Sequence, residues 1–357
     1  MHPFWNWIVQ FFPKWIAPNL LTLTGFLHLV LNFAILSYYD TNFYASDRDT
    51  PDVTPIPDWV WIMCAFNIFA ASTLDGIDGK QARRTGTSSP LGELFDHGLD
   101  SWASSLYPIS MYSIFGRGEF SVPPFRVYLI VIGVMLGFIT CHWEKYNTKI
   151  LFLPWGYDFS CIAMAGVFII TYIGGYEMWK GYAPIIGLTY AQVFEIVMHA
   201  GVFIFTFPVT FWNIYRSYRD KTGKLHGAWE ANRPLVSSCL FFGLMLLWSQ
   251  ISSCGILEQQ PRMFYLVSGV VFSNIGCKLI ISQMSDTRCE LINTLIFPLI
   301  GIVALVSLCS LGQIEVYLLA AYSVFAVCAH LHFGMCVVQE MCDHFNISAF
   351  TIRRKTS

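Results

Sequence analysis

The sequence is poor in charged residues. Asp, Glu, Lys and Arg together make up 12% of its 357 residues, whereas a soluble domain usually carries about 25%. Hydrophobic residues make up 55% of the chain. So few charged side chains do not cover the surface of a soluble protein of this length. The composition therefore excludes an ordinary soluble fold and indicates a membrane protein built from apolar helices.

Two further absences exclude two classes of function. The formal net charge is −2, so there is no basic excess to attract nucleic acid, and we expect no nucleic-acid partner. The eleven cysteines form no C-x-x-C pair, and most of them lie within apolar runs. Neither a disulfide framework nor a zinc site is therefore indicated. No repeat or low-complexity tract is present, and we expect a single domain over residues 1–357.

Long apolar runs recur along the whole chain and predict an all-α polytopic membrane protein with about ten spans. The predicted spans lie near residues 20–38, 57–76, 94–115, 124–141, 159–176, 190–212, 234–251, 263–284, 290–311 and 315–338. The second and third are interrupted by polar residues at the ends that are adjacent in sequence. We expect the functional site there.

Residues 1–19 are too aromatic and too interrupted by proline to be a cleavable signal peptide. The apolar residues Phe4, Ile8, Phe11 and Trp15 recur at helical spacing. Tryptophans at positions 5, 7 and 15 suit the headgroup level of a bilayer, so we predict an interfacial amphipathic helix. An ordinary buried amphipathic helix is the alternative.

Basic residues divide unevenly between the two sets of predicted loops. Five belong to one set: Arg48, Arg117, Arg126, Lys180 and Arg262. Fifteen belong to the other: Lys14, Lys80, Arg83, Arg84, Lys145, Lys149, Arg216, Arg219, Lys221, Lys224, Arg233, Arg288, Arg353, Arg354 and Lys355. By the positive-inside rule, this bias predicts that both termini and the 77–93 segment face the cytosol.

The acidic segment of residues 75–100 reads DGIDGKQARRTGTSSPLGELFDHGLD. Asp75 and Asp78 are spaced i, i+3, and Asp96 and Asp100 are spaced i, i+4, so each pair shares one face of its helix. One aspartate at the centre of a span costs about 2.5–3.5 kcal/mol. Four of them need positive charge, and oxygen-only ligation favours magnesium, manganese or calcium. We expect two divalent cations at this position.

A pair of such cations suggests phosphoryl chemistry, because two metals stabilise both the attacking and the leaving oxygen of an in-line displacement. Gly79 and Gly92 would let the backbone approach a nucleotide closely. Lys80, Arg83 and Arg84 lie where they would receive a polyphosphate. For these three, a plain positive-inside cluster is the alternative, and for Arg84 the two readings are equally good.

The segment resembles the signature of the CDP-alcohol phosphotransferases. The pattern D-x2-D-G-x2-A-R-x8-G-x3-D-x3-D is met at Asp75, Asp78, Gly79, Ala82, Arg83, Gly92, Asp96 and Asp100. Eight fixed positions at fixed gaps form a specific motif. The segments 17–25, 90–101 and 142–158 resemble the eukaryotic ethanolaminephosphotransferases. This resemblance implies transfer of phosphoethanolamine from CDP-ethanolamine to diacylglycerol, which yields CMP and phosphatidylethanolamine.

The resemblance also implies roles for individual residues. Asp75 and Asp96 would bridge two magnesium ions, with Asp78 completing one site and Asp100 the other. Manganese would substitute for magnesium. Asn19 and Glu93 would contact the CDP-alcohol, and Arg83 would pair with a phosphate.

The acceptor hydroxyl must lose a proton, and His97 is the candidate general base. Asp100 is the rival for that role.

Other functions remain open from the sequence. Transfer of phosphocholine is the main alternative within the family, followed by enzymes that take CDP-diacylglycerol as donor. A cation or substrate transporter is the alternative from another class, but the acidic cluster has no counterpart in residues 180–357, as an inverted repeat would require. Related enzymes imply a homodimer in the endoplasmic reticulum or the Golgi membrane.

Overall fold

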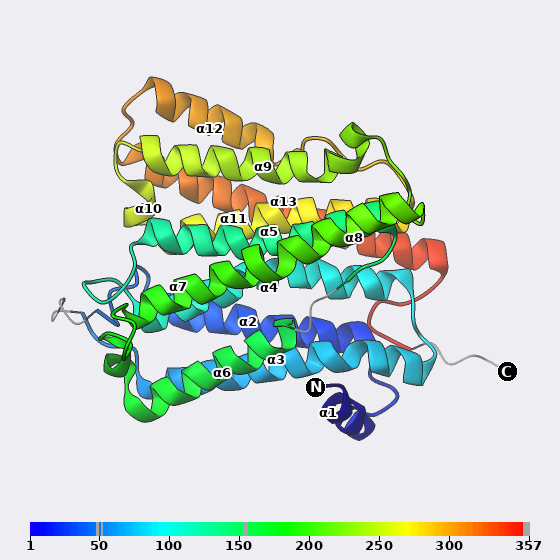
Figure 1. Cartoon of the computed structure of the whole chain (residues 1–357), viewed down its shortest axis with the longest axis horizontal. Coiled ribbons are helices and arrows are strands. Elements are labelled where there is room, and N and C mark those ends of the chain that lie inside the picture. The colour runs from blue at the N-terminus through cyan, green and yellow to red at the C-terminus, as the bar shows by residue number, and fades with distance from the viewer. Residues whose placement is uncertain (48–49, 51–52, 153–155, 353–357) are drawn as a thin grey trace.

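The computed structural model describes residues 1–47, 50, 53–152 and 156–352. This part of the chain is helical and contains no β-strand, only isolated β-bridges. The elements are α1 (His2–Ile8), η1 (Val9–Phe11), α2 (Pro18–Tyr39), α3 (Asp58–Thr85), α4 (Pro90–Phe115), α5 (Pro124–Thr148), α6 (Gly156–Gly174), η2 (Tyr176–Trp179), α7 (Tyr190–Ala200), η3 (Gly201–Thr206), α8 (Phe207–Asp220), α9 (Ala228–Ile251), α10 (Ile256–Gln259), α11 (Pro261–Met284), α12 (Ile296–Leu308) and α13 (Ile314–Phe345). Figure 1 shows the helices running roughly side by side, with the turn between α3 and α4 and the last turn of α13 at the same end of the bundle.

Each of the ten predicted spans corresponds to a helix or, for 190–212, to the continuous run α7–η3–α8. Within the described residues, seven helices are long and apolar enough to cross a membrane: α2, α3, α5, the α7–η3–α8 run, α9, α11 and α13. The apolar helices α6 and α12 are shorter. α4 has the length of a span but carries the polar residues of the acidic segment. The prediction of an all-α polytopic membrane protein is confirmed, and its count of ten is approximate.

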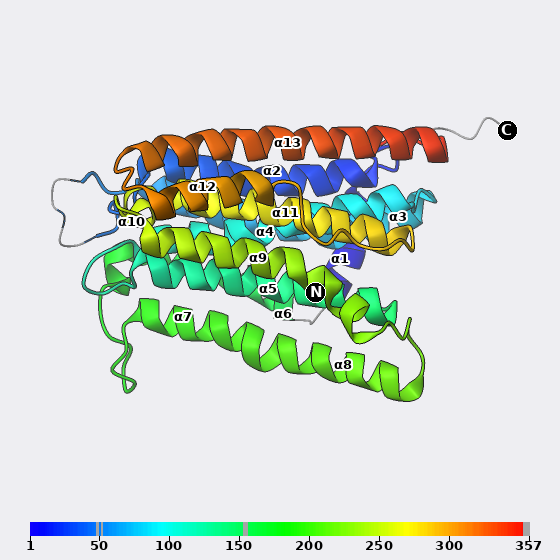
Figure 2. The same ribbon diagram turned by 90° about the horizontal axis from the view of Figure 1, so that it is seen from above.

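Helix α11 is the centre of the bundle. It packs against α4, α5, α9 and α13, and most of its residues are buried. The α7–η3–α8 run lies on the outside of the bundle, as Figure 2 shows, where it packs on α5. Many of its apolar side chains, such as Phe203, Ile204 and Phe205, are exposed. Apolar side chains that face outward from a bundle of this kind are those expected to meet lipid.

Small residues form the contact between α4 and α11. A Cβ atom at Gly269 would lie 2.1 Å from Ser105 Oγ, so no larger residue fits there without displacement. The hydroxyls of Ser101 and Ser273 are hydrogen-bonded at 2.6 Å across the same contact. Close approach through small residues with a polar contact is typical of helix pairs in membranes. This contact fixes one face of α4, the helix that carries Asp96 and Asp100.

A tight turn connects α3 to α4. Gly86 follows α3 in the left-handed conformation, with φ of 69°, which an L side chain rarely adopts. Ser89 then caps α4, because its hydroxyl accepts from the backbone N–H of Gly92 at 3.2 Å, and Pro90 opens the helix. The chain therefore reverses within a few residues, and α4 runs back beside the end of α3 that carries Asp75 and Asp78.

The N-terminal helix is shorter than the predicted 1–19 segment. α1 and the 3₁₀ turn η1 end at Phe11, because Pro13 has no N–H to continue the helix. Trp5 and Val9 are buried, whereas Trp7, Phe11 and Trp15 are exposed. The predicted apolar face through Phe11 and Trp15 is therefore not the packed face. The exposed aromatic side chains fit the interfacial interpretation.

The connections after α3, α5, α8 and α11 are those that the sequence assigned to the basic side. Lys149, Lys224 and Arg288 lie in these connections. Arg48, on the other predicted side, and Arg353, Arg354 and Lys355 lie outside the described residues. The alternation of spans therefore agrees with the predicted division of basic residues.

Candidate active site

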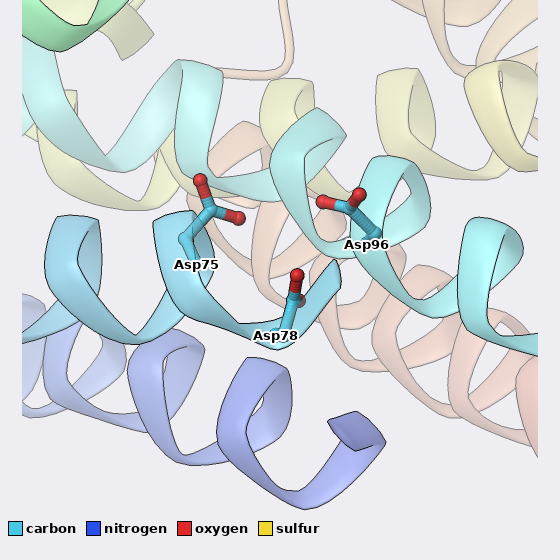
Figure 3. Close-up of side chains that lie close together, drawn as sticks. All are labelled: Asp75, Asp78 and Asp96. Carbon is cyan, nitrogen blue, oxygen red and sulfur yellow. The ribbon is translucent and has the colours of Figure 1, made fainter. Parts of the chain in front are cut away.

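Three aspartates meet between α3 and α4. Asp75 and Asp78 extend from α3 and Asp96 from α4, and Figure 3 shows the three carboxylates gathered in the space between the helices. One oxygen from each lies within 4.8 Å of the others. The i, i+3 spacing on α3 and the reversal of the chain after Gly86 produce this arrangement, as the sequence predicts.

A small cavity opens beside these carboxylates. Asp75, Asp96 and Asp100 line it, together with Thr22 and Gly25 of α2. Helix α2 packs closely against both α3 and α4, whereas α3 and α4 make few direct backbone contacts. The cavity therefore occupies the space between α3 and α4, and α2 forms its wall. Asp100 borders this cavity but does not belong to the group of three that lies within 4.8 Å.

Asp78 is fixed by two hydrogen bonds. The hydroxyl of Thr22 donates to its Oδ2 at 2.6 Å, and the backbone N–H of Gly79 donates to its Oδ1. These donors orient the carboxylate toward the other two. Sequence reasoning missed Thr22. Thr22 lies three residues after Asn19, in the 17–25 segment that resembles the relatives, and this position could have indicated it.

The three carboxylates carry negative charge without a cationic partner among the salt bridges of the described residues. Like charges this close repel strongly in a partly buried site. Oxygen ligands of one magnesium or calcium ion lie within roughly 4–5 Å of each other, since each metal–oxygen distance is about 2.0–2.6 Å. The donor set and its spacing therefore fit a hard divalent cation.

The three basic residues after Asp78 have different partners. Arg84 donates from its guanidinium to the backbone oxygens of Val9 and Phe12 at 2.7 and 2.6 Å, and the ammonium of Lys80 donates to Asn6 Oδ1 at 2.7 Å. Both therefore hold the N-terminal segment. Arg83 instead lies over Gly79, where its Nη1 would be 3.6 Å from an added Cβ, and the described residues give it no hydrogen-bond partner. It is the one of the three available to a phosphate.

His97 lies on the side of α4 that faces α5, and it does not border the carboxylate cavity. Its ring is 5.4 Å from the ring of His142, centroid to centroid, in an edge-to-face arrangement. The Nδ1 atom of His97 is buried without a hydrogen-bond partner. Gln283 holds His142 at 3.2 Å from its Nδ1. Of the two candidate bases, Asp100 therefore borders the carboxylate cavity, whereas His97 does not.

Asn19 and Glu93, which are predicted to contact the nucleotide, lie in the first turns of α2 and α4. Asn19 is buried, and its amide donates to the backbone oxygen of Ala349 at 3.0 Å. Its Oδ1 would lie 3.5 Å from a Cβ at Gly92, an ordinary contact distance. Glu93 forms an ion pair with Lys145 of α5. Sequence reasoning missed both the C-terminal segment at Ala349 and Lys145, although Lys145 falls in the quoted 142–158 segment. Residues 153–155 of that segment lie outside the described residues.

A model of the family described as CDP-alcohol phosphatidyltransferase matches residues 15–212, more than half of the chain. This stretch contains α2, α3 and α4 and every predicted site residue. The chain belongs to the CDP-alcohol phosphatidyltransferase family. It is therefore a transferase of phospholipid biosynthesis, and its family takes CDP-alcohol and diacylglycerol as substrates and depends on divalent metal ions.

Individual relatives of the family cover nearly the whole chain. Ethanolaminephosphotransferase 1 of Homo sapiens is 46% identical over 358 residues, which span all of this chain and 89% of the relative. The protein of the same name in Mus musculus is 46% identical over 359 residues, with the same coverage. Cholinephosphotransferase 1 of Danio rerio is 31% identical over 297 residues, which span 82% of this chain and 73% of the relative.

Proposed function

We propose that this enzyme transfers phosphoethanolamine from CDP-ethanolamine to diacylglycerol and releases CMP and phosphatidylethanolamine. The observation that carries the reaction class is the cluster of Asp75, Asp78 and Asp96, set in a motif with eight matched positions. In the reaction, the acceptor hydroxyl oxygen forms a bond to the β-phosphorus. The bond from that phosphorus to the oxygen of CMP breaks, and the hydroxyl proton passes to a base on the enzyme.

The choice of ethanolamine rests on the comparison with known relatives. Identity to the two ethanolaminephosphotransferases is 46% over the full chain. Identity to the cholinephosphotransferase of Danio rerio is 31% over a shorter stretch. The quoted flanking segments support the same choice. Transfer of phosphocholine is therefore the second candidate, and transport is disfavoured by the single acidic cluster and by the family.

We assign the metal site to Asp75, Asp78 and Asp96, with Asp100 as the fourth ligand at the edge of the cavity. Two magnesium ions, replaceable by manganese, match four hard oxygen donors. When bound, they would neutralise the phosphates and stabilise the charge that develops on the attacking and leaving oxygens. Thr22 contributes by holding Asp78 in place.

For the proton we propose His97 as the general base, with Asp100 as the rival. A neutral imidazole accepts a proton readily near neutral pH. The His97 ring packs against His142 of α5 and does not line the cavity. Asp100 already borders the cavity. Loss of Asp100 would weaken metal binding, whereas loss of His97 would leave it nearly intact.

For the donor we propose that Arg83 pairs with a phosphate and that Asn19 and Glu93 contact the nucleotide. Gly79 and Gly92 keep the backbone open beside Arg83 and Asn19. Diacylglycerol enters from the membrane.

We place the enzyme in the endoplasmic reticulum or Golgi membrane as a homodimer. Each subunit is one domain over residues 1–357, with both termini and the mouth of the site in the cytosol.

The test is a donor competition. Purified protein in detergent, supplied with diacylglycerol and magnesium, is given CDP-ethanolamine and CDP-choline in separate and mixed assays. Turnover with CDP-ethanolamine is expected to exceed turnover with CDP-choline. Equal or faster choline transfer contradicts the head-group assignment and leaves the reaction class intact. Absence of transfer from either donor contradicts both.

A further inference from the structure

The face of α3 that points away from the carboxylates is occupied by the N-terminal helix. Gly76, Lys80 and Arg84 are spaced i, i+4, i+8 and form one stripe of α3. Asp75 and Asp78 lie on the opposite side of the same turns. α1 and η1 pack along this stripe. A displacement of α1 therefore acts on the helical turns that present the two carboxylates.

The contact is closest at Gly76, between the two aspartates in sequence. A Cβ atom at Gly76 would lie 2.2 Å from Cε2 of Trp5 and 2.6 Å from its Cδ2 and Cζ2. The indole ring therefore rests directly on the backbone of α3. Trp5 is 6% exposed, and its Nε1 is buried without a hydrogen-bond partner, so packing alone positions the ring. Ile77, which is fully buried, belongs to the same apolar cluster.

Two cations lock the other end of this helix onto α3. Arg84 donates to the backbone oxygens of Val9 and Phe12, and its second nitrogen lies 3.4 Å from the backbone oxygen of Gln10. Carbonyls at the end of a helix lack partners within it, and a guanidinium there satisfies several at once. Lys80 adds a hydrogen bond to Asn6. The chain thus uses two of the three basic residues of its motif segment to hold α1.

We propose that α1 is a brace for the metal site, in which Trp5 is a positioning residue that sets the backbone of Gly76 and thereby the placement of Asp75 and Asp78 against Asp96. This inference rests on the proposed metal site. The signature leaves position 76 unassigned, and the sequence predicted only an interfacial position for Trp5, which is instead buried. The outer side of the brace carries the exposed Trp7, which suits the lipid headgroup level.

The experiment measures Mn²⁺ affinity of the purified full-length protein by electron paramagnetic resonance of free Mn²⁺, together with kcat and KM. Gly76→Ala is expected to weaken Mn²⁺ binding about tenfold, which is the low end of the loss in metal affinity when a residue that supports a metal ligand is changed. Its kcat should fall while the KM for diacylglycerol stays unchanged. Trp5→Ala should show the same pattern, and Trp5→Phe, which keeps an aromatic ring, should lie between it and the unsubstituted protein.

Two controls separate positioning from general damage. Gly243→Ala makes the same change in α9, where nothing lies within 4 Å of an added Cβ, and it should leave Mn²⁺ affinity unchanged. The double variant Gly76→Ala with Trp5→Ala should bind Mn²⁺ no more weakly than Trp5→Ala alone, because the methyl group meets no ring.

Gly76→Ala protein that binds Mn²⁺ and turns over within twofold of the unsubstituted protein overturns the brace. Additive losses in the double variant also overturn it. If the unsubstituted protein binds no Mn²⁺, the proposed metal site itself fails and the brace fails with it. If either substitution yields no folded protein, Trp5→Phe and Arg84→Gln provide the same test, and normal Mn²⁺ affinity in both counts against the brace.

Discussion

Two groups of buried charges lie in opposite halves of the bundle, and they are built differently. At the end of the bundle where α2 ends and α11 begins, Arg262 donates to the backbone oxygen of Asp40 and to Ser113 Oγ, and its guanidinium lies 3.9 Å from the centroid of the Phe43 ring. Arg117 forms a 3.2 Å ion pair with Glu258 nearby. In the other half, Asp75, Asp78 and Asp96 face one another without a cationic side chain among the described salt bridges.

The difference separates charges that hold the fold from charges that await a ligand. Asp40 and Arg262 neutralise each other, so removing one partner leaves the other buried and unpaired. The three aspartates repel one another in the protein alone, so removing one of them relieves repulsion. A buried group that the chain itself leaves uncompensated is the stronger indicator of function.

The largest effect is expected from Asp75→Asn. Loss of this proposed metal ligand should reduce turnover by more than about 100-fold, since changing a residue that only supports a metal ligand already costs about 10–100-fold. The melting temperature in detergent without metal should stay the same or rise, because one repelling charge is gone. Chelation of the unsubstituted protein should abolish turnover, and magnesium or manganese should restore it. Full turnover in a strong chelator would refute the metal site.

His97→Gln and Asp100→Asn distinguish the two candidates for the general base. If His97 accepts the proton, its loss should lower kcat by about 10²–10⁴ and leave Mn²⁺ and CDP-ethanolamine binding nearly intact. Asp100→Asn should weaken metal binding along with the rate. Calorimetry beside the kinetics distinguishes the two variants. Near-normal turnover of His97→Gln, together with an inactive Asp100→Asn that retains its metal, would reverse the assignment.

Arg262→Met tests the structural cluster. It leaves the Asp40 carboxylate buried and without its counter-charge, which should cost about 3–5 kcal/mol in stability. Thermal unfolding in detergent measures the loss, while turnover per folded molecule should remain normal. Adding Asp40→Asn should recover part of the melting temperature. A large loss of turnover with unchanged stability would show that this cluster also serves the reaction.

The smallest change in stability is expected at an ion pair whose carboxylate is exposed. Asp286, in the connection after α11, pairs with Lys224, and this hydrogen bond and charge lower the pKa of the Asp286 carboxyl. A lowered pKa stabilises the folded state above the unfolded pKa, and that contribution disappears as the pH falls through the folded value. Because the Asp286 side chain is 75% exposed, Asp286→Asn should shift the melting temperature at pH 7 by no more than experimental scatter. A clear shift that persists below about pH 4 would contradict this interpretation.

The sequence was most informative where spacing within one or two helices decides the geometry. The positions of Asp75 and Asp78 on one face, and the return of Asp96 toward them, follow from helical spacing and from the turn at Gly86. The placement of the spans followed from apolar length alone. α6 and α12 show the limit of that rule, because they are shorter than a typical span.

Contacts between distant segments could not be predicted from one sequence. Nothing in the composition of residues 1–19 indicates that Trp5 rests on Gly76, or that Arg84 binds the end of the same helix. The rotation of α4 that turns His97 toward His142 depends on its contact with α11, which no local pattern reveals. Helical periodicity places residues on a face but leaves open which neighbour that face meets.

The contact between α4 and α11 sets an order of events during synthesis. All of the carboxylates are present once the chain has passed residue 100, within its first third. Yet α4 acquires its Ser101–Ser273 hydrogen bond only after another 172 residues have been made. A nascent chain therefore inserts its most costly polar segment long before the helix that fixes it arrives. Until α11 enters the membrane, α2, α5 and α6 are the earlier neighbours that pack on α3 and α4, so the carboxylate cluster gains its last support late although its residues are encoded early.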